Sequence, residues 1–371
     1  MPAFDFLIIG SGIAGAGAAY ELSQAARVLL LEREDAHGYH TTGRSAALYS
    51  EAYGNAVIRG LTRASRAFFE RPPQGFCSHP LLTPRGCLYL GRADQEPALA
   101  QMLATEPEAL EPLDREAVLE RLPVLRGDYV GGGLFEAAAM DADVEALHQG
   151  FLRGARARGA EVRLSHEVVG IDRRADGYLV RCAGGVAFEA AVVVNAAGAW
   201  ADRIATLAGV RPAGLQPLRR TAVIVEAPTG VEVRGWPMVI DVDEQFYFKP
   251  DAGRILASPA DETPSEPCDA WADELDVAVC IDRMQACADI PVRRIVRAWA
   301  GLRSFVADRS PVIGFDAAAP GFFWLAGQGG YGVQTAPAAA RAAAALATRQ
   351  SLPADIAAHG VTAQSLSPAR R

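Results

Sequence analysis

A glycine-rich segment near the start of the chain has the residue types and the spacing that bind a dinucleotide. The pattern consists of three glycines and an acid: Gly10, Gly12, Gly15 and Glu32. Apolar runs at 6–9 and 28–31 flank it, so it predicts a strand, a tight turn, a helix over 14–26 and a second strand. The turn would let a pyrophosphate approach the helix start, and the acid would bind the ribose hydroxyls. Glycines also mark ordinary turns, but the flanking strands and the acid favour an adenine dinucleotide.

A second glycine-rich loop, 327–332, precedes an alanine-rich segment that we expect to be helical over 335–348. The helix start, near Gln334 and Thr335, would present unpaired N–H groups and a positive dipole, with Pro337 in the first turn. If the cofactor is a flavin, this end would stabilise the negative charge that develops on reduction. The alternative is a loop that only closes a turn against the sheet.

Two arginines and a tyrosine lie on expected strands in the second half of the chain. Arg220 and Arg303 each fall at a strand end, and Tyr247 lies within the strand segment 246–248. A guanidinium binds a carboxylate through two parallel hydrogen bonds, so the three side chains suit the acid group of a substrate. An arginine at a strand end is also an ordinary surface residue, so composition alone leaves both interpretations open.

Length and composition narrow the class of protein. The chain has 371 residues and a formal net charge of −8, so we expect two domains and no nucleic-acid partner. The six cysteines form no CxxC pair, and the six histidines lack the spacing of metal ligands. These features favour reduced thiols, a cytoplasmic location and no metal site. No signal peptide or membrane-spanning run is expected, and peripheral contact with a membrane is left open.

Segments with strand and helix patterns alternate along the rest of the chain. We expect helices at 56–70, 141–159 and 270–288, and strands at 82–90, 129–135, 162–164, 167–173, 178–182, 190–195 and 322–325. The segment 41–53 reads as a cofactor-lining loop. The apolar run 190–195 ends at small residues, as a buried strand of a parallel sheet does, so the chain returns there to its first domain.

This order predicts an α/β fold, α+β overall, in which a Rossmann-like domain is interleaved with a mixed-β-sheet substrate domain. The predicted division assigns 1–45, 145–210 and 304–371 to the nucleotide-binding domain, and 46–144 and 211–303 to the substrate-binding domain.

Five groups of residues taken together resemble one family. They are 10–15 with Glu32, 41–47, 194–200, 300–305 and 327–335. The chain resembles the D-amino acid oxidase superfamily of FAD enzymes from about residue 5 to 368, and within it the bacterial D-arginine dehydrogenases. The resemblance implies a Rossmann-like FAD-binding domain with non-covalent FAD. It also implies oxidation of a D-amino acid by hydride transfer from the α-carbon to flavin N5, which gives an imino acid that hydrolyses to a 2-oxo acid and ammonia.

The resemblance also implies roles for single residues. By similarity, the cofactor is bound by Gly10, Gly12, Ile13, Ala14, Gly15, Glu32, Arg33, Arg44, Ser45, Ala46, Val168, Ala197, Gly198, Trp200, Gly327, Gly330, Tyr331, Gly332, Val333, Gln334 and Thr335. Arg220, Tyr247 and Arg303 match a clamp for the substrate carboxylate. Tyr53 matches a tyrosine of a substrate lid, and the carbonyl of Gly330 matches an acceptor for the substrate amine.

Two departures from the D-arginine dehydrogenases concern the substrate side chain. Leu48 stands where those proteins have a histidine, and Cys87 stands where they have a glutamate that pairs with the guanidinium. A buried guanidinium without its carboxylate would lose a strong charge-assisted pair. We therefore predict that the preferred substrate has an apolar or small side chain, held in a pocket that includes Met238.

The electron acceptor and the substrate class have alternatives. Oxidases of the sarcosine-oxidase type carry a lysine above the flavin, whereas the only lysine here, Lys249, precedes the corresponding strand. This favours a dehydrogenase with an unknown acceptor, a quinone or a carrier, over an oxidase. The second function considered is an amine oxidase or dehydrogenase for glycine, sarcosine, proline or an opine. The third is a nucleotide-binding module without catalysis, which would not need the two arginines and the tyrosine.

Overall fold

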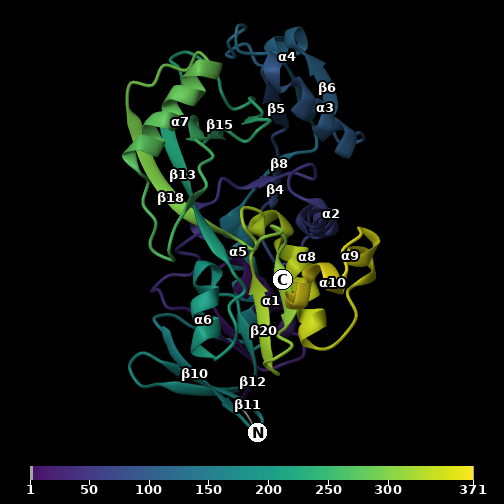
Figure 1. The fold of residues 1–371 in the computed structure, drawn as a ribbon, viewed down its shortest axis with the longest axis vertical. Helices are drawn as coiled ribbons and strands as arrows, with labels where there is room; N and C mark the ends of the chain where they lie inside the picture. The colour runs from purple at the N-terminus through teal and green to yellow at the C-terminus, as the bar shows by residue number, and fades with distance from the viewer. Residues whose placement is uncertain (1–2, 371) are drawn as a thin grey trace.

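The computed structural model describes residues 3–370 and has two lobes stacked along its longest axis (Figure 1). The lower lobe contains an eight-stranded sheet, and the upper lobe is built on a nine-stranded sheet. A small sheet joins β3 (Leu48–Tyr49), β8 (Met140–Ala142) and β4 (Leu82–Pro84) near the junction of the lobes. Because the chain passes repeatedly between the two large sheets, residues distant in sequence meet at this junction.

The eight-stranded sheet is mostly parallel. Its strands are β1 (Phe4–Ile9), β2 (Val28–Leu31), β9 (Glu161–Arg163), β10 (Val168–Arg174), β11 (Gly177–Cys182), β12 (Ala187–Asn195), β19 (Val312–Phe315) and β20 (Phe322–Ala326). Strands β9, β2, β1, β12 and β20 run parallel in that order. Every residue of β2 and β20 is buried, because packed elements cover both faces of the sheet. The prediction that 190–195 joins the first sheet is confirmed by the pairing of β12 with β1.

Helices cover both faces of this sheet. One face carries α1 (Ile13–Leu22), α2 (Ala56–Glu70), α5 (Val144–Ala157) and α8 (Gly332–Ala347), and the other carries α6 (Ala201–Leu207). Two short helices, α9 (Ala354–Ala358) and α10 (Ala363–Leu366), lie beside α8 in Figure 1. The predicted division assigns α2 to the substrate domain, yet its residues Leu61 and Phe69 belong to the core of the lower lobe.

Helix α8 begins earlier than the sequence pattern predicts. Its first residue is Gly332, three positions before the expected start. The N–H of Thr335 already donates to the carbonyl of Tyr331 at 3.1 Å, which is a helical hydrogen bond. The predicted start was therefore wrong, because the last glycine of the loop is also the first residue of the helix. Pro337 lies in the second turn, where it cannot donate to the carbonyl of Val333.

The nine-stranded sheet of the upper lobe is mixed. Its strands are β5 (Cys87–Gly91), β6 (Glu111–Asp114), β7 (Gly132–Glu136), β13 (Gln216–Glu226), β14 (Met238–Asp241), β15 (Tyr247–Asp251), β16 (Arg254–Ser258), β17 (Thr263–Pro264) and β18 (Ile295–Phe305), with α3 (Glu96–Thr105), α4 (Arg115–Arg121) and α7 (Glu274–Cys287) around it. In the antiparallel pair β13–β18, Arg220 lies opposite Gly301, two residues before Arg303. The two arginines therefore project from the same face of the sheet.

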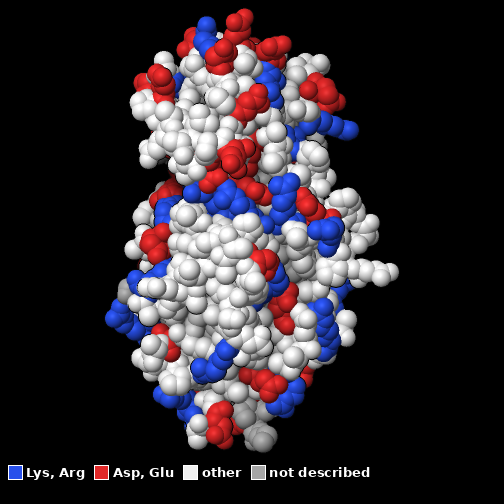
Figure 2. Space-filling view, turned by 90° about the vertical axis from the view of Figure 1, so that its right-hand side faces the viewer, with Lys and Arg blue, Asp and Glu red and all other residues white. Residues whose placement is uncertain are grey.

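Charged side chains gather where the two lobes meet on the face shown in Figure 2. Helix α2 of the lower lobe forms ion pairs there with the residue that follows α3 in the upper lobe, since both Arg59 and Arg63 contact Glu106. Arg66 of the same helix pairs with Glu51 at 3.1 Å. These pairs fix the lobes to one another beside the loop 50–54. No helix within residues 3–370 is both long and apolar enough to cross a membrane.

Candidate active site

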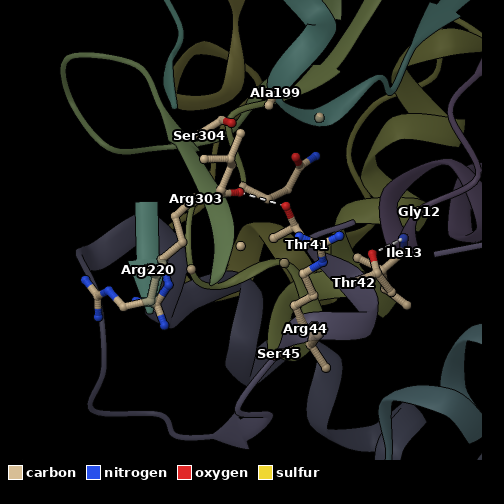
Figure 3. Close-up of a pocket in the computed structure, with 18 of the residues that line it drawn as sticks. Gly12, Ile13, Thr41, Thr42, Arg44, Ser45, Ala199, Arg220, Arg303 and Ser304 are labelled. Atoms are coloured by element: carbon tan, nitrogen blue, oxygen red, sulfur yellow. Dashed lines mark hydrogen bonds between the residues drawn. The ribbon is translucent and has the colours of Figure 1, made fainter. Parts of the chain in front are cut away.

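A long cavity extends from the end of the lower sheet to the junction of the lobes. Its first compartment, about 1460 Å³, lies beside the carboxyl ends of β1 and β2. Its second compartment, about 930 Å³, lies between the start of α1 and the strands β13 and β18 (Figure 3). A third compartment of about 560 Å³ adjoins the second. The first and second are continuous because both are lined by Gly12, Thr41, Thr42, Ala196, Gly198 and Ala199.

The predicted fingerprint forms the wall where the first two compartments meet. Gly10 has a φ of +100°, and a Cβ there would lie 2.5 Å from the carbonyl oxygen of Ala196. A Cβ on Gly15 would lie 1.9 Å from the carbonyl oxygen of Gly10, so helix and turn touch through backbone. Gly15 does not itself line the cavity. This close packing explains why position 15 is a glycine.

Glu32 is buried at the end of β2 and faces the first compartment. Its Oε2 accepts hydrogen bonds from the backbone N–H and the hydroxyl of Ser11, at 2.8 and 2.9 Å. Its Oε1 accepts the N–H of Glu34 at 3.1 Å. A carboxylate accepts about four hydrogen bonds, so one position on Glu32 is left for a ligand. The other predicted residues in this compartment are Gly10, Gly12, Arg33, Val168, Ala197, Gly198 and Trp200.

The second compartment brings together most of the residues predicted at the flavin end. They are Gly12, Ile13, Ala14, Arg44, Ser45, Ala46, Gly198, Gly327, Gly330, Gly332 and Val333. The N–H of Ile13 donates to the Thr42 hydroxyl at 3.0 Å, which ties the start of η1 (Thr42–Arg44) to the start of α1. Ser304 Oγ and Gln328 Nε2 are buried in this wall and have no hydrogen-bond partner among the described residues. These two atoms are available to a polar ligand.

Arg44 lines the second compartment, but its guanidinium is used within the protein. Nη1 donates to the carbonyls of Ala270 and Ala300, both at 2.8 Å, and Nη2 pairs with Asp269. These bonds hold the guanidinium, while the predicted place of Arg44 beside the cofactor stays a prediction. The guanidinium fastens the cofactor loop to β18, and the aliphatic stem lies beside Gly301.

Arg220 lies in the wall of the second compartment and is only 6% exposed. Its Nε donates to the carbonyl of Asp261 at 2.8 Å, and its Nη2 donates to Glu262 at 3.2 Å. Nη1 has no hydrogen bond to any described residue. One edge of the guanidinium is thus fixed by the protein, and the free donors remain on the other edge, where a bidentate carboxylate can bind.

Arg303 lines both the second and the third compartment, as does Tyr247. Burial lowers the pKa of the Arg303 guanidinium, but Tyr53, Tyr247 and Glu244 raise it by more, so the net pKa lies above the usual value. The group is a permanent cation at the junction of the two compartments. A Cβ on Gly330 would lie 2.7 Å from Nη1 of Arg303, so only glycine leaves room for the guanidinium.

The third compartment is mainly apolar. Its wall consists of Ser45, Ala46, Ala47, Leu48, Tyr53, Met238, Ile240, Glu244, Tyr247, Arg303, Gly330, Val333 and Gln334. The Tyr53 hydroxyl donates to Glu244 at 3.1 Å across its rim. Burial, followed by the charge of Glu244, raises the pKa of Tyr53. Tyr53 therefore stays protonated at neutral pH.

Three further predicted residues lie outside the cavity wall. Cys87 is fully buried in β5, paired beside Met238 of β14, and does not line the third compartment. Its predicted place in the pocket needs correction, because the pocket-facing position belongs to Met238. Thr335 donates its hydroxyl to the carbonyl of Tyr331 inside α8, and the Tyr331 ring packs against Tyr53 and Phe305. Neither residue lines the cavity, and their predicted contacts with the cofactor stay a prediction.

Several residues of the cavity are not assigned a role by the sequence. Thr41, Thr42 and Gln328 lie within segments already marked by their motifs, so position in the motif could have indicated them. Glu244 is a candidate for the pocket from its sequence position, but a turn acid with φ +54° is more often solvated, so the sequence alone assigns it no role. Only the packing of its turn against the loop 50–54 brings it to the third compartment.

The residues of the first two compartments fit FAD. The two joined compartments offer space for a dinucleotide, with an acceptor on Glu32 at one end and free polar atoms on Ser304 and Gln328 at the other. The glycines at the helix start leave backbone accessible to phosphate groups. These acceptors, donors and backbone groups suit the ribose, ring and phosphate parts of a flavin dinucleotide.

Comparisons with known proteins agree with this geometry. A family model described as FAD dependent oxidoreductase matches residues 5–346. L-2-hydroxyglutarate dehydrogenase from Escherichia coli (strain K12) is 27% identical over 222 residues, which are 56% of this chain and 51% of that protein. The chain thus spans about half the length of that relative. Glycine oxidase from Geobacillus kaustophilus is 23% identical over 382 residues, 97% of each chain.

Solved structures share the whole fold. The crystal structure of glycine oxidase from Geobacillus kaustophilus superposes with a TM-score of 0.84 at 22% identity and covers 100% of both chains. The crystal structure of L-proline dehydrogenase from P. horikoshii gives a TM-score of 0.79 at 22% identity, and covers 99% of this chain and 97% of the other. At these identities the likeness establishes the arrangement of the two lobes.

Proposed function

The chain belongs to the family of FAD-dependent oxidoreductases, and we propose that it oxidises a D-amino acid with an apolar or small side chain. The amino acid loses a hydride from its α-carbon and a proton from its amine, and the resulting imino acid hydrolyses to a 2-oxo acid and ammonia. FAD, when bound, supplies the acceptor for the hydride. The D configuration follows from the resemblance to the D-arginine dehydrogenases.

The observation that carries the proposal is the convergence of Arg220, Tyr247 and Arg303 on one wall of the second compartment. Two cations and a phenol on one wall suit an anionic substrate group such as a carboxylate, which a guanidinium binds through two hydrogen bonds. Arg220 keeps its Nη1 free, and Arg303 lies where the second compartment opens into the third. A carboxylate bound there would place the α-carbon near the boundary between the two compartments.

The third compartment supports an apolar or small side chain. Leu48, Met238 and Ile240 form much of its wall, together with alanines and Val333. Its one carboxylate, Glu244, already accepts the Tyr53 hydroxyl and faces the charge of Arg303. A cationic side chain would have to compete with both of these groups.

The site has no obvious side-chain base for the substrate amine. Tyr53 has a raised pKa and stays protonated, and its hydroxyl is bonded to Glu244. Positioning of the α-carbon by the two arginines would therefore provide most of the rate acceleration, while solvent takes the amine proton.

Flavin bleaching tests the proposal directly. The purified yellow protein is mixed without oxygen with the D and L forms of alanine, leucine, methionine, phenylalanine and arginine. We expect bleaching by apolar D-amino acids and none by the L forms. Preference for D-arginine would reject the side-chain assignment, and bleaching by L forms alone would reject the stereochemical one.

A second candidate is oxidation of glycine, sarcosine or proline. The full-length similarity to glycine oxidase favours it, because glycine has no side chain and the carboxylate clamp alone could hold it here. The same bleaching series decides between the two candidates when glycine, sarcosine and both forms of proline are included.

We further propose that a carrier or quinone, not oxygen, reoxidises the protein. Lys249, the only lysine, donates to Asp141 at 2.7 Å, is 5% exposed, and does not line the cavity. A cation that could promote the reaction of a reduced flavin with oxygen is thus absent at this position. Stopped-flow mixing of the reduced protein with oxygen should show slow reoxidation, and fast reoxidation would reject the proposal.

A further inference from the structure

A chain of hydrogen bonds lies behind the fingerprint turn. Arg156 of α5 contacts His37 Nε2 at 2.8 Å, and His37 Nδ1 contacts the Ser11 hydroxyl at 2.9 Å. The same hydroxyl donates to Glu32 at 2.9 Å. Ser11 stands between Gly10 and Gly12, so the chain connects a helix of the lower lobe to the acid at the end of β2.

The chemistry of the groups sets the direction of each bond. A guanidinium can only donate, so His37 Nε2 must accept and the ring carries its proton on Nδ1. Nδ1 therefore donates to the Ser11 oxygen, whose own proton is directed to the carboxylate. The series therefore runs from Arg156 through His37 and Ser11 to Glu32, and each donor in it has one acceptor.

A second histidine holds the same turn from another side. His148, 1% exposed on α5, donates from Nε2 to the carbonyl of Ser11 at 2.7 Å. Ser11 is fully buried, and its N–H, hydroxyl and carbonyl are all bonded. Because hydrogen bonds inside a protein strengthen one another, this arrangement leaves the turn and Glu32 with one orientation.

Burial keeps both histidines neutral. Burial lowers the pKa of His37, the charges of Arg156 and His148 lower it further, and Glu32 opposes them. Burial also lowers the pKa of His148, against the bond to the Ser11 carbonyl. A neutral His37 is the form that can accept from Arg156 and donate to Ser11 at the same time.

We propose that His37 is a positioning residue for the adenosine end of the cofactor, acting through Ser11 on Glu32. The relay directs the remaining acceptor position of Glu32 at the ribose, and so makes the site select a nucleotide with a 2′-hydroxyl. The inference rests on FAD binding and on the ribose role of Glu32, and is independent of the substrate.

The test measures cofactor affinity and ribose selectivity on the full-length chain. The FAD dissociation constant is measured by ultrafiltration of the diluted holoprotein, with free FAD read from its absorbance. Displacement of FAD by ADP is then compared with displacement by 2′-deoxy-ADP. For the wild-type chain we expect 2′-deoxy-ADP to be about tenfold weaker, because it lacks the hydroxyl that Glu32 accepts.

Three substitutions of His37 separate positioning from packing. His37→Ala removes the donor, and His37→Gln places an amide near Nε2 and not near Nδ1; both should weaken FAD binding about tenfold and abolish the preference for ADP. His37→Asn keeps a donor near Nδ1, and should retain affinity and preference within about twofold of the wild type. His359→Ala, on the surface beyond α9, is the matched control and should change neither.

A double substitution gives the sharpest result. Ser11→Ala should reproduce the loss seen in His37→Ala, and adding His37→Ala to Ser11→Ala should cause no further loss, because both act through the same hydroxyl. Additive losses, or failure of His37→Asn to restore the ADP preference, would overturn the relay. Equal displacement by ADP and 2′-deoxy-ADP in the wild-type chain would overturn the ribose role on which it rests.

Discussion

The cofactor half of the cavity and its substrate half are built in different ways. Glycines, Ser11 and Glu32 of the first half come from one continuous stretch, 6–32, in which strand, turn and helix place them next to each other. The substrate half takes Leu48, Tyr53, Arg220, Met238, Tyr247, Arg303 and Gly330 from separate segments. Local structure is therefore enough to place the glycines beside Glu32, whereas the rest of the cofactor wall and the whole substrate half need segments that meet only in the folded chain.

The two halves also differ in how their polar groups are used. Ser11 is fully bonded and Glu32 has one acceptor position left. On the substrate side, Arg220 keeps Nη1 free, and Tyr53, Tyr247 and Glu244 raise the pKa of Arg303 and so favour its charged form. The polar groups of the first half are therefore almost all bonded within the protein, whereas the second half keeps charged donors free for a ligand. Substitutions should separate these two behaviours.

The largest effect is expected from the clamp. Arg303→Ala should lower kcat/KM for the best D-amino acid. The corresponding activation free energy should rise by about 2–5 kcal/mol, because the substitution removes one partner of a buried charge pair. FAD content, read from the flavin absorbance of the purified protein, should remain that of the wild type. Arg297→Ala, on the exposed part of the same strand, is the control. Loss of FAD together with activity would show that the halves are not separable.

A substitution at the fingerprint turn should instead lower stability and FAD content. Gly10→Ala forces a residue with a Cβ to adopt φ +100° and brings that Cβ within 2.5 Å of the Ala196 carbonyl. The strained backbone alone should cost about 1–3 kcal/mol of folding free energy, and the overlap adds to it. We expect a lower melting temperature and loss of FAD. Gly209→Ala has a φ of +67° but open space around its Cβ, so it measures the backbone strain by itself.

Substrate preference should change at Met238 with a smaller effect. Met238→Ala enlarges the third compartment, so kcat/KM for D-phenylalanine relative to D-alanine should rise by about tenfold, the amount expected for one or two methylene groups. Met284→Ala, on the buried face of α7 in the core of the upper lobe, should cost similar stability without changing the preference. An unchanged ratio in the Met238 variant would show that the side chain of the substrate lies elsewhere.

The smallest effect concerns pH and the cofactor half alone. Burial lowers the pKa of His148 below 6.5 in the folded chain, so the unfolded chain takes up a proton first as the pH falls. The free energy of unfolding should therefore decrease below about pH 6.5. His148→Gln retains a donor for the Ser11 carbonyl and cannot titrate. The free energy of unfolding of this variant should therefore decrease less between pH 7 and 5 than that of the wild type. Identical profiles in urea titrations would contradict this assignment.

Much of the fold could be predicted from the sequence. The bounds of α2 match the prediction, and β12 joins β1 as expected, because amphipathic and apolar patterns are local properties of the chain. The start of α8 was misplaced, since a glycine can be both the end of a loop and the first residue of a helix. The motifs also located most of the cofactor wall.

The sequence by itself determined the fingerprint turn, because a strand, a glycine turn and a helix bring neighbouring residues together locally, whereas the rest of the cofactor wall comes from distant segments such as 38–46, 166–168, 196–200 and 327–333. Only the tertiary structure decided the substrate site. The pairing of β13 with β18 sets Arg220 and Arg303 on one face, and the packing of the lobes brings Glu244 to Tyr53, while Cys87, beside Met238, stays outside the third compartment. Such contacts depend on strand register and on the junction of the lobes, and neither is encoded in a local pattern.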